Sequence, residues 1–162
     1  IIGKMFIDEY MVLGGILPAH DASLIIRGLR TLPIRMERIQ ASTQKIVAAF
    51  KTHPRVKKLL YPFDPDFPQY DLARKQMSGC GGLFTVEFDY PDIESLLEAI
   101  ARIKRWKIAV SWGGHEALML PMAALYNLPG RNDPHIPWTY VRFYVGLEEP
   151  EYLLEDLAEA FH

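Results

Sequence analysis

Two short segments in the C-terminal third of the 162-residue chain combine residue types that can bind a carboxylate. The first is the loop sequence Ser111-Trp112-Gly113-Gly114, and the second is the strand-like run Val141-Arg142-Phe143-Tyr144-Val145. An arginine guanidinium can hold a carboxylate through two parallel hydrogen bonds, a geometry that lysine does not supply. A serine beside two glycines can donate from its hydroxyl and its N–H, while the glycines allow close backbone approach to a ligand. We therefore take Arg142, Ser111 and Trp112 as candidate ligand-binding residues, with Trp112 as a pocket wall.

Each segment also has a plainer explanation. On pattern alone, an arginine in a strand is more often a surface residue paired with a glutamate. The serine-glycine segment is more often an ordinary turn with a packing tryptophan. It lacks the spaced glycines and long following helix of a nucleotide-phosphate loop. Residue types alone leave the choice open.

The remaining reactive residue types form weaker patterns. Gly79 to Gly82 precede a strand rather than a helix, so we expect a bulge or a close crossing of backbones there. The five histidines have no ligand spacing and Cys80 is the single cysteine, so no metal site is predicted. His115 beside Glu116 is a minor acid–base candidate, because adjacent residues on a turn rarely face the same point.

Composition limits the class of protein. The chain is 49% hydrophobic and 23% charged, which suits one domain, or one domain plus an appendage. A net charge of -2 gives no electrostatic case for binding nucleic acid or an anionic membrane. No apolar run is long enough to span a bilayer, and the single cysteine favours a reducing, cytoplasmic setting. The first residue is Ile1 rather than Met, from which we expect a piece of a longer protein.

The elements that would position these residues follow from hydrophobic periodicity. Helices are predicted at about 2–13, 18–32, 33–53, 69–77, 91–103 and 150–161, and strands at 56–61, 83–88, 108–110 and 139–145. Alternation in the last strand directs Val141, Phe143 and Val145 toward covering helices. Arg142 and Tyr144 then face a cleft or solvent. The predicted fold is α+β, with a small sheet covered on one face by helices.

Several further motifs occur in a fixed order along essentially the whole chain. They include Arg27-Gly28-Leu29, His53-Pro54-Arg55-Val56, Tyr61-Pro62, Ser78-Gly79-Cys80-Gly81-Gly82 and the run from Val141-Arg142 to Gly146-Leu147-Glu148. Together with Ser111-Trp112-Gly113-Gly114, they resemble the C-terminal portion of the pyridoxal 5'-phosphate (PLP) enzymes of cysteine and methionine metabolism. That family includes cystathionine γ-synthase, cystathionine β- and γ-lyases, and methionine γ-lyase.

The resemblance implies a fold and a site. It implies the C-terminal small domain of a fold-type I PLP enzyme, with a mostly antiparallel sheet preceded by linking helices. Residues 1–31 would be the end of the large cofactor domain and the linking helices, and residues 32–162 the C-terminal substrate-binding domain. Arg142 would bind the substrate α-carboxylate, and Ser111 would help to position it beside the cofactor lysine. Trp112 is similar to the tryptophan of cystathionine β-lyases.

The resemblance also implies an activity. The full-length protein would be a PLP-dependent carbon–sulfur lyase or transsulfuration enzyme that acts on cystathionine or a related sulfur amino acid. It would be a cytoplasmic homotetramer in which this chain adjoins the N-terminal part of the same enzyme. Alternatives are a methionine γ-lyase or O-acylhomoserine sulfhydrylase, and a stand-alone ligand-binding or assembly domain without catalysis.

Other family features are missing or altered. No lysine lies in the Ser-x-Thr-Lys context of the Schiff-base lysine, and Lys4 lies on the connecting helix. We therefore assign no catalytic residue here, leave the cofactor-binding residues unknown, and expect this chain alone to be inactive. Leu125-Tyr126-Asn127 replaces a Met-Thr-His stretch, while Ile39 and Ser42 replace a histidine and an asparagine. The first change falls in the expected pocket for the substrate side chain, so the sequence does not decide which group the enzyme would release.

Overall fold

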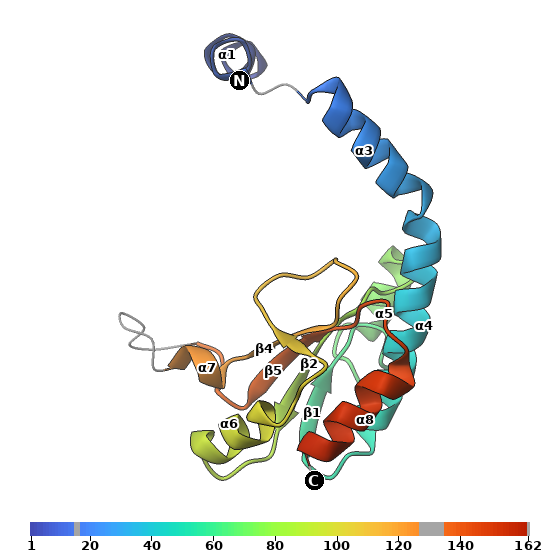
Figure 1. Ribbon diagram of the computed structural model, residues 1–162, viewed down its shortest axis with the longest axis vertical. Coiled ribbons are helices and arrows are strands. Elements are labelled where there is room, and N and C mark those ends of the chain that lie inside the picture. The colour runs from blue at the N-terminus through green and yellow to red at the C-terminus, as the bar shows by residue number, and fades with distance from the viewer. Residues whose placement is uncertain (15–16, 127–134, 162) are drawn as a thin grey trace. The chain divides into compact units, whose positions relative to one another are not determined.

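A single five-stranded sheet, in the order β1-β2-β5-β4-β3, organises the computed structural model (Figure 1). The structure describes residues 1–14, 17–126 and 135–161. Its strands are β1 (Val56–Leu60), β2 (Leu83–Phe88), β3 (Lys107–Ile108), β4 (Leu118–Pro121) and β5 (Tyr140–Tyr144). All neighbouring strands pair antiparallel except β3 and β4, which pair parallel. The predicted α+β class with a mostly antiparallel sheet is confirmed.

The chain divides into two compact units, residues 1–35 and 36–162. In the first unit, α1 (Ile2–Lys4), η1 (Met5–Tyr10) and α2 (Met11–Leu13) form one helical stretch that contains a π-helical segment. Gly14 ends this stretch in the left-handed conformation, at φ 65°, as its sequence predicts. Then follows α3 (Ala19–Arg30), whose apolar residues, such as Leu24, are exposed. The π-helical segment is not predicted by the sequence.

Helices cover one face of the sheet in the second unit. These are α4 (Leu32–Lys51), which begins in the first unit, α6 (Ile93–Ala101) and α8 (Pro150–Ala160). Their buried residues meet the inward residues of β2 and β5, among which Val141 and Phe143 are fully buried, as is Val145 directly after β5. The Phe143 ring lies 5.2 Å from those of Phe50 and Phe84, and burying each such side chain stabilises the fold by about 1.5–3 kcal/mol. The inward face predicted for β5 is confirmed.

The sequence-based prediction misses two elements. No helix or strand is predicted between the Ser111 loop and the loop at 127–137, where the structure has β4 and α7 (Ala123–Tyr126). All four residues of β4 are buried, so the strand is a continuous apolar run without the alternation that identifies a half-buried strand. The strand predicted at 108–110 is Lys107–Ile108. Most of the loop predicted at 127–137, including Asn127, lies outside the described residues.

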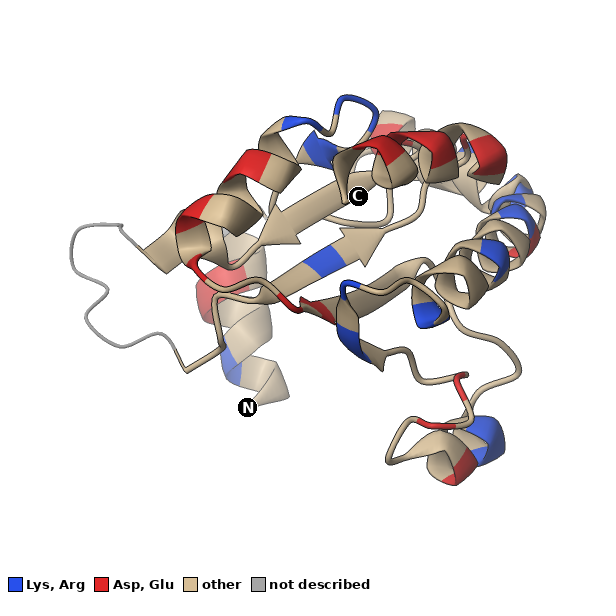
Figure 2. Ribbon diagram, turned by 90° about the horizontal axis from the view of Figure 1, so that it is seen from below, with Lys and Arg blue, Asp and Glu red and all other residues tan. Residues whose placement is uncertain are grey.

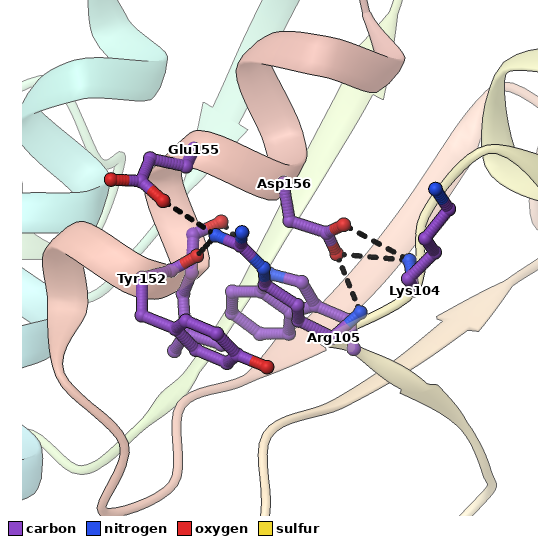
Figure 3. A network of polar contacts seen from close by, with 7 residues as sticks. Lys104, Arg105, Tyr152, Glu155 and Asp156 are labelled. Carbon is purple, nitrogen blue, oxygen red and sulfur yellow. Dashed lines mark hydrogen bonds and ion pairs between the residues drawn. The ribbon is translucent and has the colours of Figure 1, made fainter.

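A buried carboxylate joins α8 to the connection between α6 and β3 (Figure 3). Asp156 is 2% exposed. It accepts hydrogen bonds from the backbone N–H groups of Lys104, at 3.0 and 3.1 Å, and Arg105, at 2.7 Å. The Arg105 guanidinium in turn binds Glu155 at 2.9 Å and lies over the Tyr152 ring. These contacts hold β3, and thus the start of the Ser111 loop, against the helical layer.

The remaining described elements lie outside this layer. A short helix, α5 (Tyr70–Gln76), follows β1. Among the described residues, no helix is both long and apolar enough to cross a bilayer.

Candidate carboxylate-binding site

Arg142 lies at the centre of the sheet, on the middle strand β5. It is paired with Thr85 of β2 on one side and with Leu120 of β4 on the other. Because its neighbours Val141 and Phe143 point into the helical layer, the Arg142 side chain extends from the opposite face. There it lines a cavity of about 500 Å³ together with mostly apolar residues: Leu60, Thr85, Leu120, Met122, Leu125, Ile136 and Tyr140. The predicted direction of Arg142, away from the helices, is therefore confirmed.

The structure brings the three predicted site residues together. The Arg142 Nη2 group donates to the carbonyl oxygens of Val110 and Ser111, the latter at 3.4 Å. The Arg142 guanidinium carbon lies 5.2 Å from the centroid of the Trp112 ring, within the range of a cation–π contact. Ser111 and Trp112 are both exposed. Backbone carbonyls of a loop 31 residues away in the sequence thus hold one edge of the guanidinium.

Arg142 keeps donors available for an anion. No ion pair among the described residues involves Arg142, so within this part of the chain no carboxylate competes for its guanidinium. Within the described part of the chain, its Nε and Nη1 groups have no hydrogen-bond partner. A guanidinium presents five N–H donors, so the bonds to the loop leave enough for a two-point grip on a carboxylate.

None of the acidic residues that the structure describes around the sheet forms an ion pair with Arg142. Figure 2 shows acidic residues along the helix that ends at the C-terminus, α8, which carries Glu151, Glu155, Asp156 and Glu159. This helix packs on the face of the sheet that buries Val141 and Phe143, so the sheet separates it from Arg142. Glu87 of β2 pairs with Lys57 at 3.2 Å. The guanidinium therefore retains a positive charge that can attract an anion.

The loop after Ser111 is held at the end of β5 by contacts that the sequence did not predict. The Tyr144 hydroxyl donates to Gly114 O at 3.0 Å, and the Ala117 N–H donates to the Glu148 carboxylate at 2.8 Å. Tyr144 was predicted to flank Arg142 toward a cleft or solvent. It is instead 5% exposed and packs with Ile39 and Leu118. The alternation of the strand predicts the face of the sheet on which Tyr144 lies. It does not predict that the Ser111 loop covers this side chain.

Two weaker candidates have structural explanations. His115 Nδ1 lies 3.2 Å from Glu116 Oε2, but the His115 side chain is 85% exposed and does not line the Arg142 cavity. The pKa of Glu116 lies below its usual value because its own backbone N–H and the nearby His115 stabilise the carboxylate.

At Gly82, an added Cβ would lie 2.6 Å from Val145 O. The predicted close crossing of backbones is therefore found at this glycine.

The described lining of the cavity offers no amine for covalent attachment of PLP. None of these lining residues is a lysine. Elsewhere, Lys45, Lys51 and Lys57 are each held in ion pairs with carboxylates. What the described lining does offer is the Arg142 guanidinium, a group that can hold a carboxylate.

Comparison with known proteins gives consistent matches along the whole chain. The model of the family "Cys/Met metabolism PLP-dependent enzyme" matches residues 4–162. The chain is 36% identical to an L-methionine gamma-lyase of Treponema denticola over 99% of its own length and 42% of that protein. It is 34% identical to a cystathionine gamma-lyase of Bacillus subtilis over 91% of its length and 39% of that protein.

A relative with a different activity matches equally well. The chain is 32% identical to an L-alanine/L-glutamate racemase of Wolbachia pipientis wMel, over 98% of its length and 40% of that protein. The chain thus spans about two fifths of the length of these three relatives.

Proposed function

Because the chain belongs to the Cys/Met metabolism PLP-dependent enzyme family, we propose that it forms the substrate-carboxylate site of such an enzyme. The full-length protein would cleave or exchange a carbon–sulfur bond in cystathionine or a related sulfur amino acid. The observation that carries this proposal is the position of Arg142, on the central strand, beside the Ser111 loop and over an open cavity.

The names of the relatives support a substrate with an α-carboxylate more strongly than they support a substrate that contains sulfur. Methionine and cystathionine carry sulfur, whereas alanine and glutamate do not, and enzymes named for each of these match the chain. All four molecules are α-amino acids, with a carboxylate on the α-carbon. A guanidinium that grips this carboxylate would serve every one of them. Lyase and transsulfuration chemistry is favoured because the relatives named for methionine and cystathionine are 36% and 34% identical to the chain, compared with 32% for the racemase.

In this proposal the chain's own residues bind and orient the substrate. Arg142 provides two parallel N–H groups that fix the plane of the carboxylate, and so fix which bond of the α-carbon faces the reactive group. Ser111 supplies a second donor at the edge of the cavity. The Trp112 ring shields the guanidinium from water on one side, which strengthens its attraction for an anion. PLP, when bound by the rest of the enzyme, supplies an electron sink for carbanion chemistry.

The partners are part of the proposal. Since the chain spans 39–42% of three relatives, we propose that the N-terminal part of the same enzyme completes the site and carries the catalytic lysine. We also propose a homotetramer, as the family resemblance implies. Light scattering of the full-length protein tests this assembly, and a monomer in solution would exclude it.

Substitution of Arg142 tests the proposed function. In the full-length protein, Arg142→Lys keeps the charge but loses the bidentate geometry, and Arg142→Ala loses both. We expect kcat/KM for L-cystathionine or L-methionine to fall on the order of 100-fold with alanine and less with lysine. Glu94→Ala, on the exposed surface of α6, is the control. Wild-type kcat/KM in Arg142→Ala would refute the assignment.

A second activity is favoured by one comparison. The racemase of Wolbachia pipientis wMel matches 98% of the chain, so an α-amino-acid racemase is the second candidate function. Chiral chromatography after incubation of the full-length protein with L-alanine and L-glutamate separates the two. Accumulation of the D-amino acid, with no thiol or keto acid released from L-methionine or L-cystathionine in a parallel incubation, would favour racemisation.

A further inference from the structure

The carboxylate of Glu148 reaches back from the end of β5 to the base of the Ser111 loop. Its Oε1 atom accepts the Ala117 N–H at 2.8 Å, and Ala117 is fully buried. Its Oε2 atom is also buried and has no hydrogen-bond partner among the described residues. A buried carboxylate oxygen without a partner is costly, so its presence here calls for a physical reason.

The backbone around Gly146 shows how tightly this carboxylate is inserted. A Cβ added at Gly146 would lie 2.3 Å from His115 O, 2.5 Å from the Glu116 carbonyl carbon and 2.4 Å from Glu148 Oε2. The Leu147 N–H also donates to His115 O at 2.7 Å. The turn at residues 146–148 and the loop at residues 115–117 are therefore in direct contact, with the Glu148 carboxylate beside them.

The loop depends on these polar contacts because little else holds it. Residues 111–115 are all exposed, so no burial of apolar side chains fixes their position. β5 and the turn after it contact the loop at its start through Arg142, in its middle through Tyr144, and at its end through Leu147 and Glu148. Among these bonds, the one to the Glu148 carboxylate from a loop amide has a charged acceptor, which makes it stronger than a neutral bond.

The turn that carries Glu148 is itself tied to a helix. Arg38 of α4 donates to Glu148 O at 3.4 Å and forms an ion pair with Glu149 at 2.8 Å. The Glu149 side chain is 72% exposed, and its ion pair is with Arg38 of α4 rather than with the loop. These two adjacent glutamates therefore differ in role: Glu149 faces solvent and α4, whereas Glu148 faces the loop.

We propose that Glu148 is a positioning residue that holds the loop at residues 111–117 in register with Arg142, so that Ser111 and the guanidinium meet the same carboxylate. This inference rests on the proposed function, because it assigns Glu148 a role only through the carboxylate site. Together with the bond from the Leu147 N–H to His115 O, the bond from the Ala117 N–H to Glu148 fixes the end of the loop and so limits where Ser111 can lie above β5. Glu148 itself does not contact the substrate.

The test compares Glu148→Ala and Glu148→Gln with the neighbouring control Glu149→Ala in the full-length protein. We expect Glu148→Ala to speed amide hydrogen exchange in residues 111–117 by about tenfold, the equilibrium equivalent of one lost charge-assisted hydrogen bond. KM for the amino-acid substrate should rise by about the same factor, with kcat changed far less. Glu148→Gln keeps an oxygen acceptor for Ala117 and should restore most of both. Glu149→Ala should match the wild type.

A second measurement separates positioning from general damage to the fold. Inhibition by an amino acid should weaken in Glu148→Ala, whereas inhibition by the corresponding amine, which lacks the carboxylate, should not. Equal weakening for both inhibitors would overturn the proposal, as would wild-type KM and loop exchange in the alanine variant. If Glu148→Ala does not fold, Glu148→Leu, which fills the same space without an acceptor, provides the comparison. Loop exchange and KM equal to those of Glu149→Leu would then overturn the proposal.

The same inhibitors distinguish failure of this inference from failure of the proposed function. Arg142→Lys should lose the preference for the amino acid over its amine. If it keeps that preference, the carboxylate site itself is wrong. If Arg142→Lys loses the preference and Glu148→Ala keeps it, the site stands and the positioning role of Glu148 is wrong.

Discussion

Replacing Asp156 with alanine should loosen the connection that delivers β3 to the Ser111 loop. The Asp156 carboxylate is 2% exposed and accepts from the backbone N–H groups of Lys104 and Arg105 (Figure 3). Alanine removes the acceptor and leaves both donors unpaired. A backbone donor that loses its partner costs about 1–3 kcal/mol, so two of them should cost about 3 kcal/mol together. Asparagine keeps one oxygen and should cost about half as much.

Hydrogen exchange gives this free energy locally, without requiring the whole protein to unfold in one step. A loss of about 3 kcal/mol corresponds to exchange about 100-fold faster, and we expect it at the amides of Lys104 and Arg105. Glu98→Ala, on the exposed surface of α6, is the matched control and should change exchange little. If Asp156→Ala leaves these two amides within about threefold of the wild type, the assigned role of the carboxylate is wrong.

Two further predictions concern packing and pH. Gly82→Ala should destabilise the second unit by about 1–3 kcal/mol, because the new Cβ would lie 2.6 Å from Val145 O. Gly81→Ala, whose Cβ would meet its nearest neighbour at 3.7 Å, should be near neutral, and equal melting temperatures for the two variants would contradict this. Burial and the charge of Arg55 lower the pKa of His53 from its ordinary 6.5, so the unfolded chain binds a proton more readily. The free energy of unfolding should therefore fall as the pH drops from about 7 through the ordinary pKa of histidine. Urea unfolding should show a less steep fall in His53→Gln.

Much of the second unit can be predicted because its strands have one buried and one open face. In β2, Phe84, Val86 and Phe88 are buried and the residues between them are not, and the sequence shows this alternation directly. The same pattern orients Arg142 correctly. β4 could not be found in this way, because all four of its residues are buried and the local sequence carries no period.

The site was predictable in its residue types but not in its support. Arg142 and Ser111 stand out because arginine and a glycine-flanked serine have specific chemistry, and the family resemblance brings the two motifs together. The contacts of Glu148 with Ala117 and of Tyr144 with Gly114 join residues about thirty positions apart. No local pattern encodes such a contact, because it depends on how the turn after β5 packs on the loop.

The most direct test of the carboxylate site is a crystal structure of the full-length protein with PLP and an unreactive amino-acid inhibitor. We predict that two nitrogens of Arg142 lie about 2.7–2.9 Å from the two oxygens of the inhibitor's α-carboxylate. Ser111 should lie within hydrogen-bond distance of the same group. A carboxylate bound elsewhere, with Arg142 still held only by the carbonyls of Val110 and Ser111, would contradict the account.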